Sequence, residues 1–122
     1  QIILEPGRYF YLEINTNKNF LTRDFDDALI VFIELRDEEN VTVPDNDHKI
    51  KVEVNGAGKL LGLESGNQYS HEPYHSNVRK SFNGRLIAII GYEESKEEFI
   101  TIKITDLDND VTKEKKIQTG NK

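Results

Sequence analysis

Apolar and polar side chains alternate with a period of two along much of this chain. Residues 8–15, 49–54 and 98–105 place apolar side chains at every second position and mostly polar ones between them. This pattern predicts β-strands with one buried face, because successive side chains of a strand point to opposite sides of its sheet. Two further segments, 28–37 and 85–92, are apolar on both faces, which is typical of central strands.

The remaining segments complete a domain built from strands. Residues 59–64 and 114–118 are two more short strands, and the polar stretch 16–27 has room for an edge strand. Turn residues separate the strands, and no segment shows a convincing helical pattern. We therefore predict an all-β, antiparallel β-sandwich of about seven strands over residues 8–118, with a linker at 1–7 and a disordered tail at 119–122. We expect its core to consist of Phe10, Leu12, Ile14, Leu29, Val31, Ile33, Leu35, Ile50, Val52, Val54, Leu86, Ala88, Ile90, Ile100, Ile102 and Ile104.

Composition narrows the possible partners. The 122 residues suit one domain, and the absence of cysteine excludes disulfides and thiolate metal ligands. The chain carries 22 acidic against 16 basic residues, a net charge of −6, which argues against nucleic acid as a partner. It lacks an apolar run of about 18 residues, so we expect no membrane contact. Because it does not begin with methionine, we expect it to be a piece of a larger protein.

Residues 62–91 are the most informative stretch, with two strand-like ends and a polar, aromatic middle. His71, Glu72 and His75 match the zinc-protease motif H-E-x-x-H, which works because a helix places both histidines on one face. Here Pro73 lies between the histidines, and a proline inside a helix costs roughly 3 kcal/mol. We therefore interpret the match as a coincidence within a loop, and we expect neither a metal nor a cofactor.

Two acidic runs also invite a chemical interpretation. Asp106, Asp108 and Asp110 suggest calcium, but the glycine and glutamate positions of an EF-hand loop are not met, so a hairpin turn explains them better. The glutamates of residues 93–98 suggest a glycosidase acid and base. That chemistry needs two carboxylates held across a cleft, which an exposed acidic turn does not provide.

The middle of residues 62–91 resembles a known family. Ser65-Gly66-Asn67, Ser70-His71-Glu72-Pro73-Tyr74 and Arg79-Lys80-Ser81-Phe82-Asn83-Gly84 are similar to the run G-N-G-D-x-x-S-H-E-P-F…R-K-A-F-N-G. That run belongs to the C-terminal immunoglobulin-like domain of glycoside hydrolase family 2 β-galactosidases. Gln68 and Tyr69 replace the second glycine and the aspartate of the family pattern, and Tyr74 replaces its phenylalanine. The resemblance extends over about residues 9–105.

This resemblance implies an immunoglobulin-like sandwich that is a non-catalytic accessory domain. The parent would be a bacterial enzyme that hydrolyses β-galactosides with retention, using two glutamates on a TIM barrel outside this chain. We expect a periplasmic or secreted location for that parent, although the chain itself does not fix the compartment. The partners implied are the other domains of the parent glycosidase, and carbohydrate is a second candidate.

The loop around residues 66–84 is the candidate contact site. Aromatic rings together with hydrogen-bonding side chains suit sugar contact, and they equally suit docking onto another domain. They also suit simple anchoring of the loop to its own sandwich. A long structured loop in a compact domain is usually functional, so we predict that it contacts the rest of the enzyme, near the rim of the active site, and is more mobile than the sheets. The candidate residues are Asn67, Tyr69, His71, Glu72, Tyr74, Arg79, Lys80, Phe82 and Asn83.

Two alternatives from other classes stay open. A stand-alone carbohydrate-binding module would bind galactosides or plant glycans by itself. A bacterial adhesion-type immunoglobulin-like domain would occur in tandem copies, and no internal repeat is visible within this chain.

Overall fold

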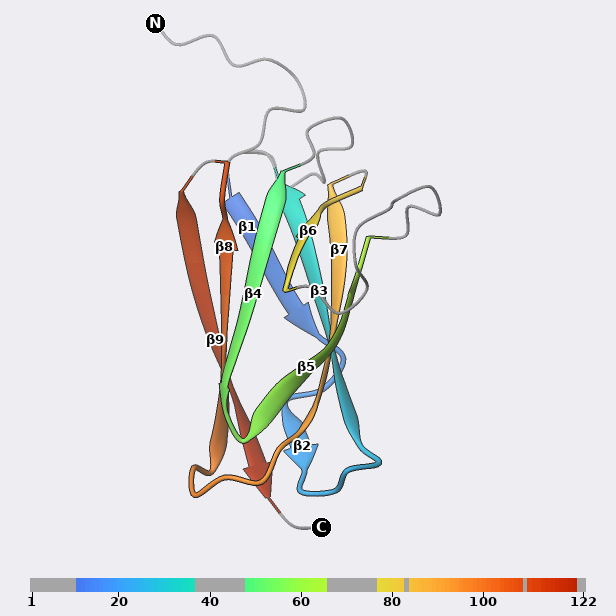
Figure 1. Cartoon of the computed structure of the whole chain (residues 1–122), viewed down its shortest axis with the longest axis vertical. Coiled ribbons are helices and arrows are strands. Elements are labelled where there is room, and N and C mark those ends of the chain that lie inside the picture. The colour runs from blue at the N-terminus through green and yellow to red at the C-terminus, as the bar shows by residue number, and fades with distance from the viewer. Residues whose placement is uncertain (1–10, 37–47, 66–76, 83, 109, 121–122) are drawn as a thin grey trace, which may run out of the picture.

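The chain folds into two facing β-sheets (Figure 1). The computed structural model describes residues 11–36, 48–65, 77–82, 84–108 and 110–120. These ranges contain nine strands and no helix, and therefore no helix that could span a membrane. The strands are β1 (Tyr11–Thr16), β2 (Phe20–Thr22), β3 (Ala28–Arg36), β4 (Lys49–Gly56), β5 (Gly58–Glu64), β6 (Val78–Lys80), β7 (Arg85–Tyr92), β8 (Phe99–Asp106) and β9 (Val111–Gly120).

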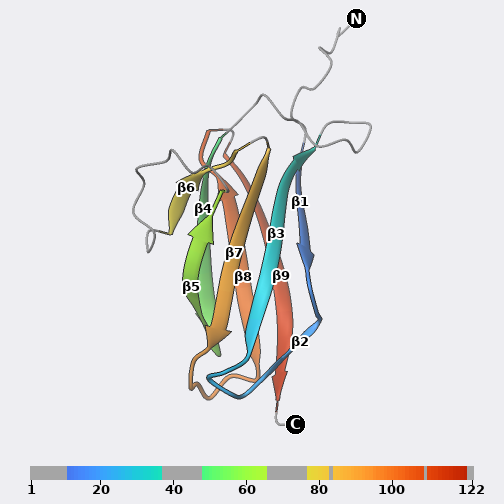
Figure 2. The ribbon, with the colours of Figure 1, turned by 90° about the vertical axis from the view of Figure 1, so that its right-hand side faces the viewer.

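The first sheet has the order β1-β3-β7-β5 and the second sheet has the order β2-β9-β8-β4-β6. Figure 2 shows the first sheet in front of the second. The prediction of a β-sandwich is confirmed. The two segments predicted to be central strands, β3 and β7, are the two inner strands of the first sheet.

The core fills the space between the sheets and is entirely aliphatic except for one tyrosine. Every second residue of β3, β4, β7 and β8 points inward, as the alternation predicts. The predicted core residues that the structure describes are buried, except that Val54 is only partly buried. Phe10 lies outside the described residues. The buried apolar residues are Leu12, Ile14, Leu21, Leu29, Val31, Ile33, Leu35, Ile50, Val52, Ala57, Leu63, Leu86, Ala88, Ile90, Tyr92, Ile100, Ile102, Ile104 and Ile117.

The described residues contain two strands more than the predicted seven. Both are only three residues long, too short to show a clear alternating pattern in the sequence. One is β2, the edge strand for which residues 16–27 left room, and the other is β6, inside the stretch that was expected to be loop. The β2–β9 pair is also parallel, where an antiparallel sandwich was expected. The chain leaves the first sheet after β1 and continues in the same direction into the second sheet. It therefore runs alongside β9 instead of against it.

The crossing from β1 to β2 is held by side chains. Asn17 takes over pairing with β3: its backbone N donates to the carbonyl of Ile30 (3.0 Å), and its Oδ1 accepts from the backbone N of Ile30 (2.9 Å). Asp27 forms an ion pair with Lys18 and accepts from the backbone N of Thr22 at 2.9 Å. These contacts lower the pKa of Asp27 from 3.8 to about 2, chiefly through Lys18.

The C-terminal boundary of the sandwich differs from the expected one. The last strand continues through Thr119 and Gly120, where a disordered tail was predicted, because β2 pairs with Gln118–Gly120. The Thr119 side chain is buried and its Oγ1 donates to the carbonyl of Glu98 at 2.8 Å. The predicted linker at residues 1–7 and residues 121–122 lie outside the described residues.

Candidate functional site

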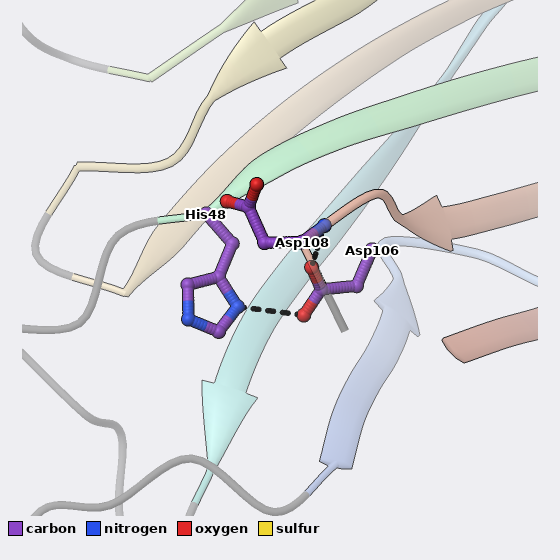
Figure 3. Close-up of side chains that lie close together, drawn as sticks. All are labelled: His48, Asp106 and Asp108. Carbon is purple, nitrogen blue, oxygen red and sulfur yellow. Dashed lines mark hydrogen bonds and ion pairs between the residues drawn. The ribbon is translucent and has the colours of Figure 1, made fainter. Parts of the chain in front are cut away.

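Three chain segments meet at the end of the sandwich where β4 begins and β8 ends. His48 directly precedes β4, Asp106 is the last residue of β8, and Ser81 follows β6. Figure 3 shows the His48 ring facing the Asp106 carboxylate, with Asp108 beside them on the β8–β9 turn. The side chains of His48, Ser81 and Asp106 are buried, and Asp106 is 0% exposed. We call this group of buried polar side chains, together with Asp108, the His48–Asp106 cluster.

Hydrogen bonds within the chain account for this geometry. His48 Nδ1 lies 2.7 Å from Asp106 Oδ2, so an ionised Asp106 places the proton on Nδ1. The other oxygen, Oδ1, accepts from the backbone N of Asp108 at 3.0 Å. Asp108 Oδ2 in turn accepts from the backbone N of Lys49 at 2.9 Å. The buried carboxylate therefore ties the start of β4 to the end of β8.

Ser81 attaches β6 to the same point. Its backbone N donates to the carbonyl of His48 (2.9 Å), and its Oγ accepts from the backbone N of His48 (3.0 Å). This reciprocal pair extends the β4–β6 ladder by one residue. Ser81 thus holds the short edge strand against β4.

His48, Asp106 and Asp108 each offer one possible metal-ligand atom. These three atoms lie within 4.8 Å of one another, a spacing that could hold a metal ion. Both oxygens of Asp106 and one of Asp108 already accept hydrogen bonds from the chain, and His48 Nδ1 is also engaged. A cation on these atoms would have to replace the bonds that join β4 to the β8–β9 turn. We therefore interpret the cluster as structural: its hydrogen bonds hold the start of β4 against the β8–β9 turn.

The aspartate run that suggested calcium is a hairpin turn, as predicted. The bond from the backbone N of Asp108 to Asp106 is an Asx turn, in which a side chain caps the backbone two residues further on. Asp110 is exposed and has a φ of 55°, a left-handed conformation that aspartate tolerates better than most residues. The acidic turn at residues 93–98 connects β7 to β8 at the opposite end of the sandwich, and Glu93, Glu94, Glu97 and Glu98 are exposed there.

Only part of the predicted contact loop is described. Asn67, Tyr69, His71, Glu72, Tyr74 and Asn83 lie outside the described residues. Arg79 and Lys80 belong to β6, at the edge of the second sheet. Arg79 is buried beside Ile50, whereas Lys80 is exposed beside Lys49.

Phe82, the remaining described residue of that set, is 38% exposed in the connection from β6 to β7. Its backbone N donates to the carbonyl of Arg85 at 3.0 Å. The structure thus brings Arg79, Lys80 and Phe82 close to the His48–Asp106 cluster, through the pairing of β6 with β4.

Sequence reasoning missed His48 as a partner of Asp106. The two residues are 58 positions apart, so no local spacing connects them. The sequence offered only a weaker indication. His48 precedes one alternating strand and Asp106 ends another, and antiparallel pairing of these two strands would bring the two residues together. The register of β4 with β8, which places Ile50 opposite Asp106, achieves this.

A second feature is the outer face of the first sheet. Phe32 and Ile87 are register partners on β3 and β7, and they are 39% and 37% exposed. With Asn15, Glu34 and Arg85 they border a hollow of about 440 Å³. Another hollow, of about 340 Å³, lies between β4 and β5, and its described lining contains no aromatic ring on which a sugar could stack.

This chain is similar in sequence to part of larger glycoside hydrolases. Residues 12–115 match the family described as "Glycoside hydrolase family 2 C-terminal domain 5". A curated relative, a β-galactosidase of Bacteroides ovatus, is 30% identical over 88 residues, which cover 72% of this chain and 10% of that enzyme. The chain therefore spans about a tenth of the length of the relative it matches.

Solved structures of family 2 enzymes share the fold. A glycosyl hydrolase family 2 member from Bacteroides cellulosilyticus has a TM-score of 0.85 at 15% identity, over 93% of this chain and 14% of that one. A β-glucuronidase of family 2 has a TM-score of 0.74 at 14% identity, over 93% of this chain and 12% of that one. The sandwich thus occurs beside other domains in larger enzymes, and the chain belongs to the glycoside hydrolase family 2 C-terminal domain 5 family.

Proposed function

We propose that this chain is a non-catalytic, immunoglobulin-like accessory domain of a bacterial family 2 β-galactosidase, where it docks on the catalytic part and supports it. The observation that carries the proposal is the family match over residues 12–115, joined by a β-galactosidase as a curated relative. Because the chain corresponds to 10% of that relative, the sugar-cleaving residues of the parent would lie outside it.

The substrate is the first point to test. The β-galactosidase relative is similar in sequence, whereas the β-glucuronidase is similar in fold alone. We therefore expect the full-length enzyme to cleave a chromogenic β-galactoside in preference to the matching β-glucuronide. A preference for the glucuronide would overturn the proposed substrate while leaving the accessory role in place.

The non-catalytic role rests on the positions of the described carboxylates. Glycosidases hold two carboxyl groups about 5–10 Å apart across a sugar-binding cleft. Asp106 is buried and bonded to His48, and the glutamates of residues 93–98 are exposed on a turn at the other end. The chain expressed alone should not hydrolyse a chromogenic galactoside. Hydrolysis that survives rigorous repurification would contradict this role.

We also propose that the loop of residues 66–84 is a contact toward the parent. The exposed Phe82 and Lys80 support it, because they stand on a segment that Ser81 fastens to β4. A double substitution, His71→Ala with Tyr74→Ala, tests the loop in the full-length enzyme and in the chain alone. We expect the melting temperature of the chain to change little, and the activity or stability of the parent to fall.

A matched control for the loop is Glu114→Ala, an exposed residue on the outer face of β9. It should change neither the chain nor the parent. If the double variant unfolds the chain alone while the parent keeps full activity, the loop is internal scaffolding. Galactoside binding by the chain that disappears with Tyr74→Ala would instead favour direct sugar contact.

A further inference from the structure

The outer face of the first sheet is apolar at its centre. Along β3, Ile30 and Phe32 alternate with core residues and therefore point away from the core, and on β7 Ile87 and Ile89 do the same. Their register places Phe32 opposite Ile87 and Ile30 opposite Ile89. Four large apolar side chains therefore form one block on the two inner strands.

The apolar block continues onto the edge strand β5. Leu61 stands at a bulge in the β5–β7 pairing and is 39% exposed. A Cβ added at Gly91 would lie 2.8 Å from Leu61 Cδ1, so the leucine side chain lies directly over this glycine of β7. A bulge redirects a side chain, and here it adds Leu61 to the same surface.

The charges beside this block are paired with one another. Glu34 accepts from Arg36 at 2.9 Å and lies 3.5 Å from Arg85 Nε. The Glu34 carboxylate also raises the pKa of Arg36. Covering this surface would therefore not leave Glu34 as a lone buried charge, which is the arrangement that makes an interface costly.

The outer face of the second sheet shows what a solvated face of this domain looks like. Its central row reads Glu53, Lys103 and Glu114 across β4, β8 and β9, with opposite charges side by side. The neighbouring row holds Asn55, Thr101 and Lys116. An antiparallel sheet with one wet face normally alternates in this way, so the apolar outer face of the first sheet requires a different explanation.

We propose that the outer face of the first sheet is the surface against which a neighbouring domain of the same family 2 chain packs. The occupant follows from the size of family members, because this chain covers only 10–14% of the relatives described above. A domain in the same polypeptide is present at high effective concentration, so a modest apolar surface is enough to hold it. An apolar centre with charges at its margin is also the usual composition of such an interface. The inference rests on the proposed accessory role and adds a second surface to the loop.

The test is thiol labelling of single-cysteine positions in the full-length enzyme, since this chain has no cysteine of its own. Phe32→Cys and Ile87→Cys probe the apolar face. Asn55→Cys and Glu114→Cys, at two exposed positions of the other face, are the matched controls. Each variant is treated with a maleimide, and labelling at each site is followed by peptide mass spectrometry, in buffer and in urea. We expect labelling in buffer to be at least roughly tenfold slower at positions 32 and 87 than at the controls, and equal at all four in urea.

Equal labelling at all four positions in buffer would overturn the inference. A second result would also overturn it: labelling at positions 32 and 87 is slow at high protein concentration, becomes fast on dilution, and sedimentation shows a dimer dissociating over the same range. A second copy of the enzyme would then be the occupant of this face. Labelling does not depend on turnover. An enzyme that cleaves galactosides but labels equally on both faces therefore contradicts this interface alone, whereas protection in an enzyme that cleaves no glycoside contradicts the proposed function alone.

Discussion

The two outer faces of this sandwich have the same backbone pattern and opposite chemistry. In β8, Thr101, Lys103 and Thr105 alternate with buried isoleucines, whereas in β3 the residues between the buried ones include Ile30 and Phe32. Both strands contribute buried apolar side chains to the core between the sheets. The second apolar face of β3 lies outside that core, so its apolar character is not explained by the packing between the sheets, and the proposed contact with a neighbouring domain would account for it.

The largest expected effect separates the inner face from the apolar outer face. Ile102 is completely buried, so Ile102→Ala should lower the free energy of unfolding by roughly 2–5 kcal/mol. Ile87 is 37% exposed, so Ile87→Ala should cost about 1 kcal/mol or less in this chain. Urea denaturation of both variants gives the two values. Equal costs would mean that Ile87 belongs to the core, and the comparison of faces would fail.

The next effect concerns the His48–Asp106 cluster, which joins the start of β4 to the end of β8 in the sheet with the charged outer face. Asp106→Asn should destabilise the chain by roughly 1–3 kcal/mol, because it weakens buried hydrogen bonds to a charged group. The control is Asp108→Asn, whose side chain is exposed and should matter less. Thermal unfolding of both variants measures the difference. A larger loss for Asp108 would show that the link between β4 and β8 depends on the turn instead of on the His48–Asp106 pair.

A smaller effect is expected where the chain crosses from the first sheet to the second. The pKa of Asp27 is lowered from 3.8 to about 2, so the ionised group binds its partners better in the folded state. Its contribution is fully present above pH 3.8, the unfolded-state value, and is lost as the pH falls through about 2. Asp27→Asn should cost roughly 1 kcal/mol at neutral pH, clearly less near pH 2, and nothing once the pH is well below the folded-state pKa.

Urea denaturation from neutral to acid pH checks the Asp27 prediction. The stability curves of the variant and of the unchanged chain should converge as the pH falls. Asp24→Asn, an acidic neighbour in the same connection, is the control. A gap between the curves that stays constant with pH would show that Asp27 acts through packing rather than through its charge.

The smallest effect belongs to the charged outer face. Lys103 is partly exposed and lies between Glu53 and Glu114 in register, and attraction between charges at a protein surface contributes little to stability. Lys103→Ala should therefore change the unfolding free energy by less than about 0.5 kcal/mol, and raised salt should reduce even that. Chemical denaturation at low and high salt measures it. A cost comparable to that of Ile102→Ala would mean that this face is not simply solvated.

The alternation of apolar and polar residues by itself determined the strands and most of the core. Ile100, Ile102 and Ile104 could be assigned inward because a strand has only two faces and one must be buried. The loop pattern of residues 65–84 likewise indicated the family without any knowledge of the sheet order, and the match over residues 12–115 confirms that family.

The tertiary structure alone decided which ends and edges come together. The pairing of His48 with Asp106 joins residues 58 positions apart, and the parallel pairing of β2 with β9 joins segments from near the two ends of the chain. Likewise, only the sheet order showed that the second apolar face of β3 and β7 lies on the outside. Such contacts depend on sheet order and register, which arise from packing of the whole chain, whereas a periodic pattern records only the local choice between inside and outside.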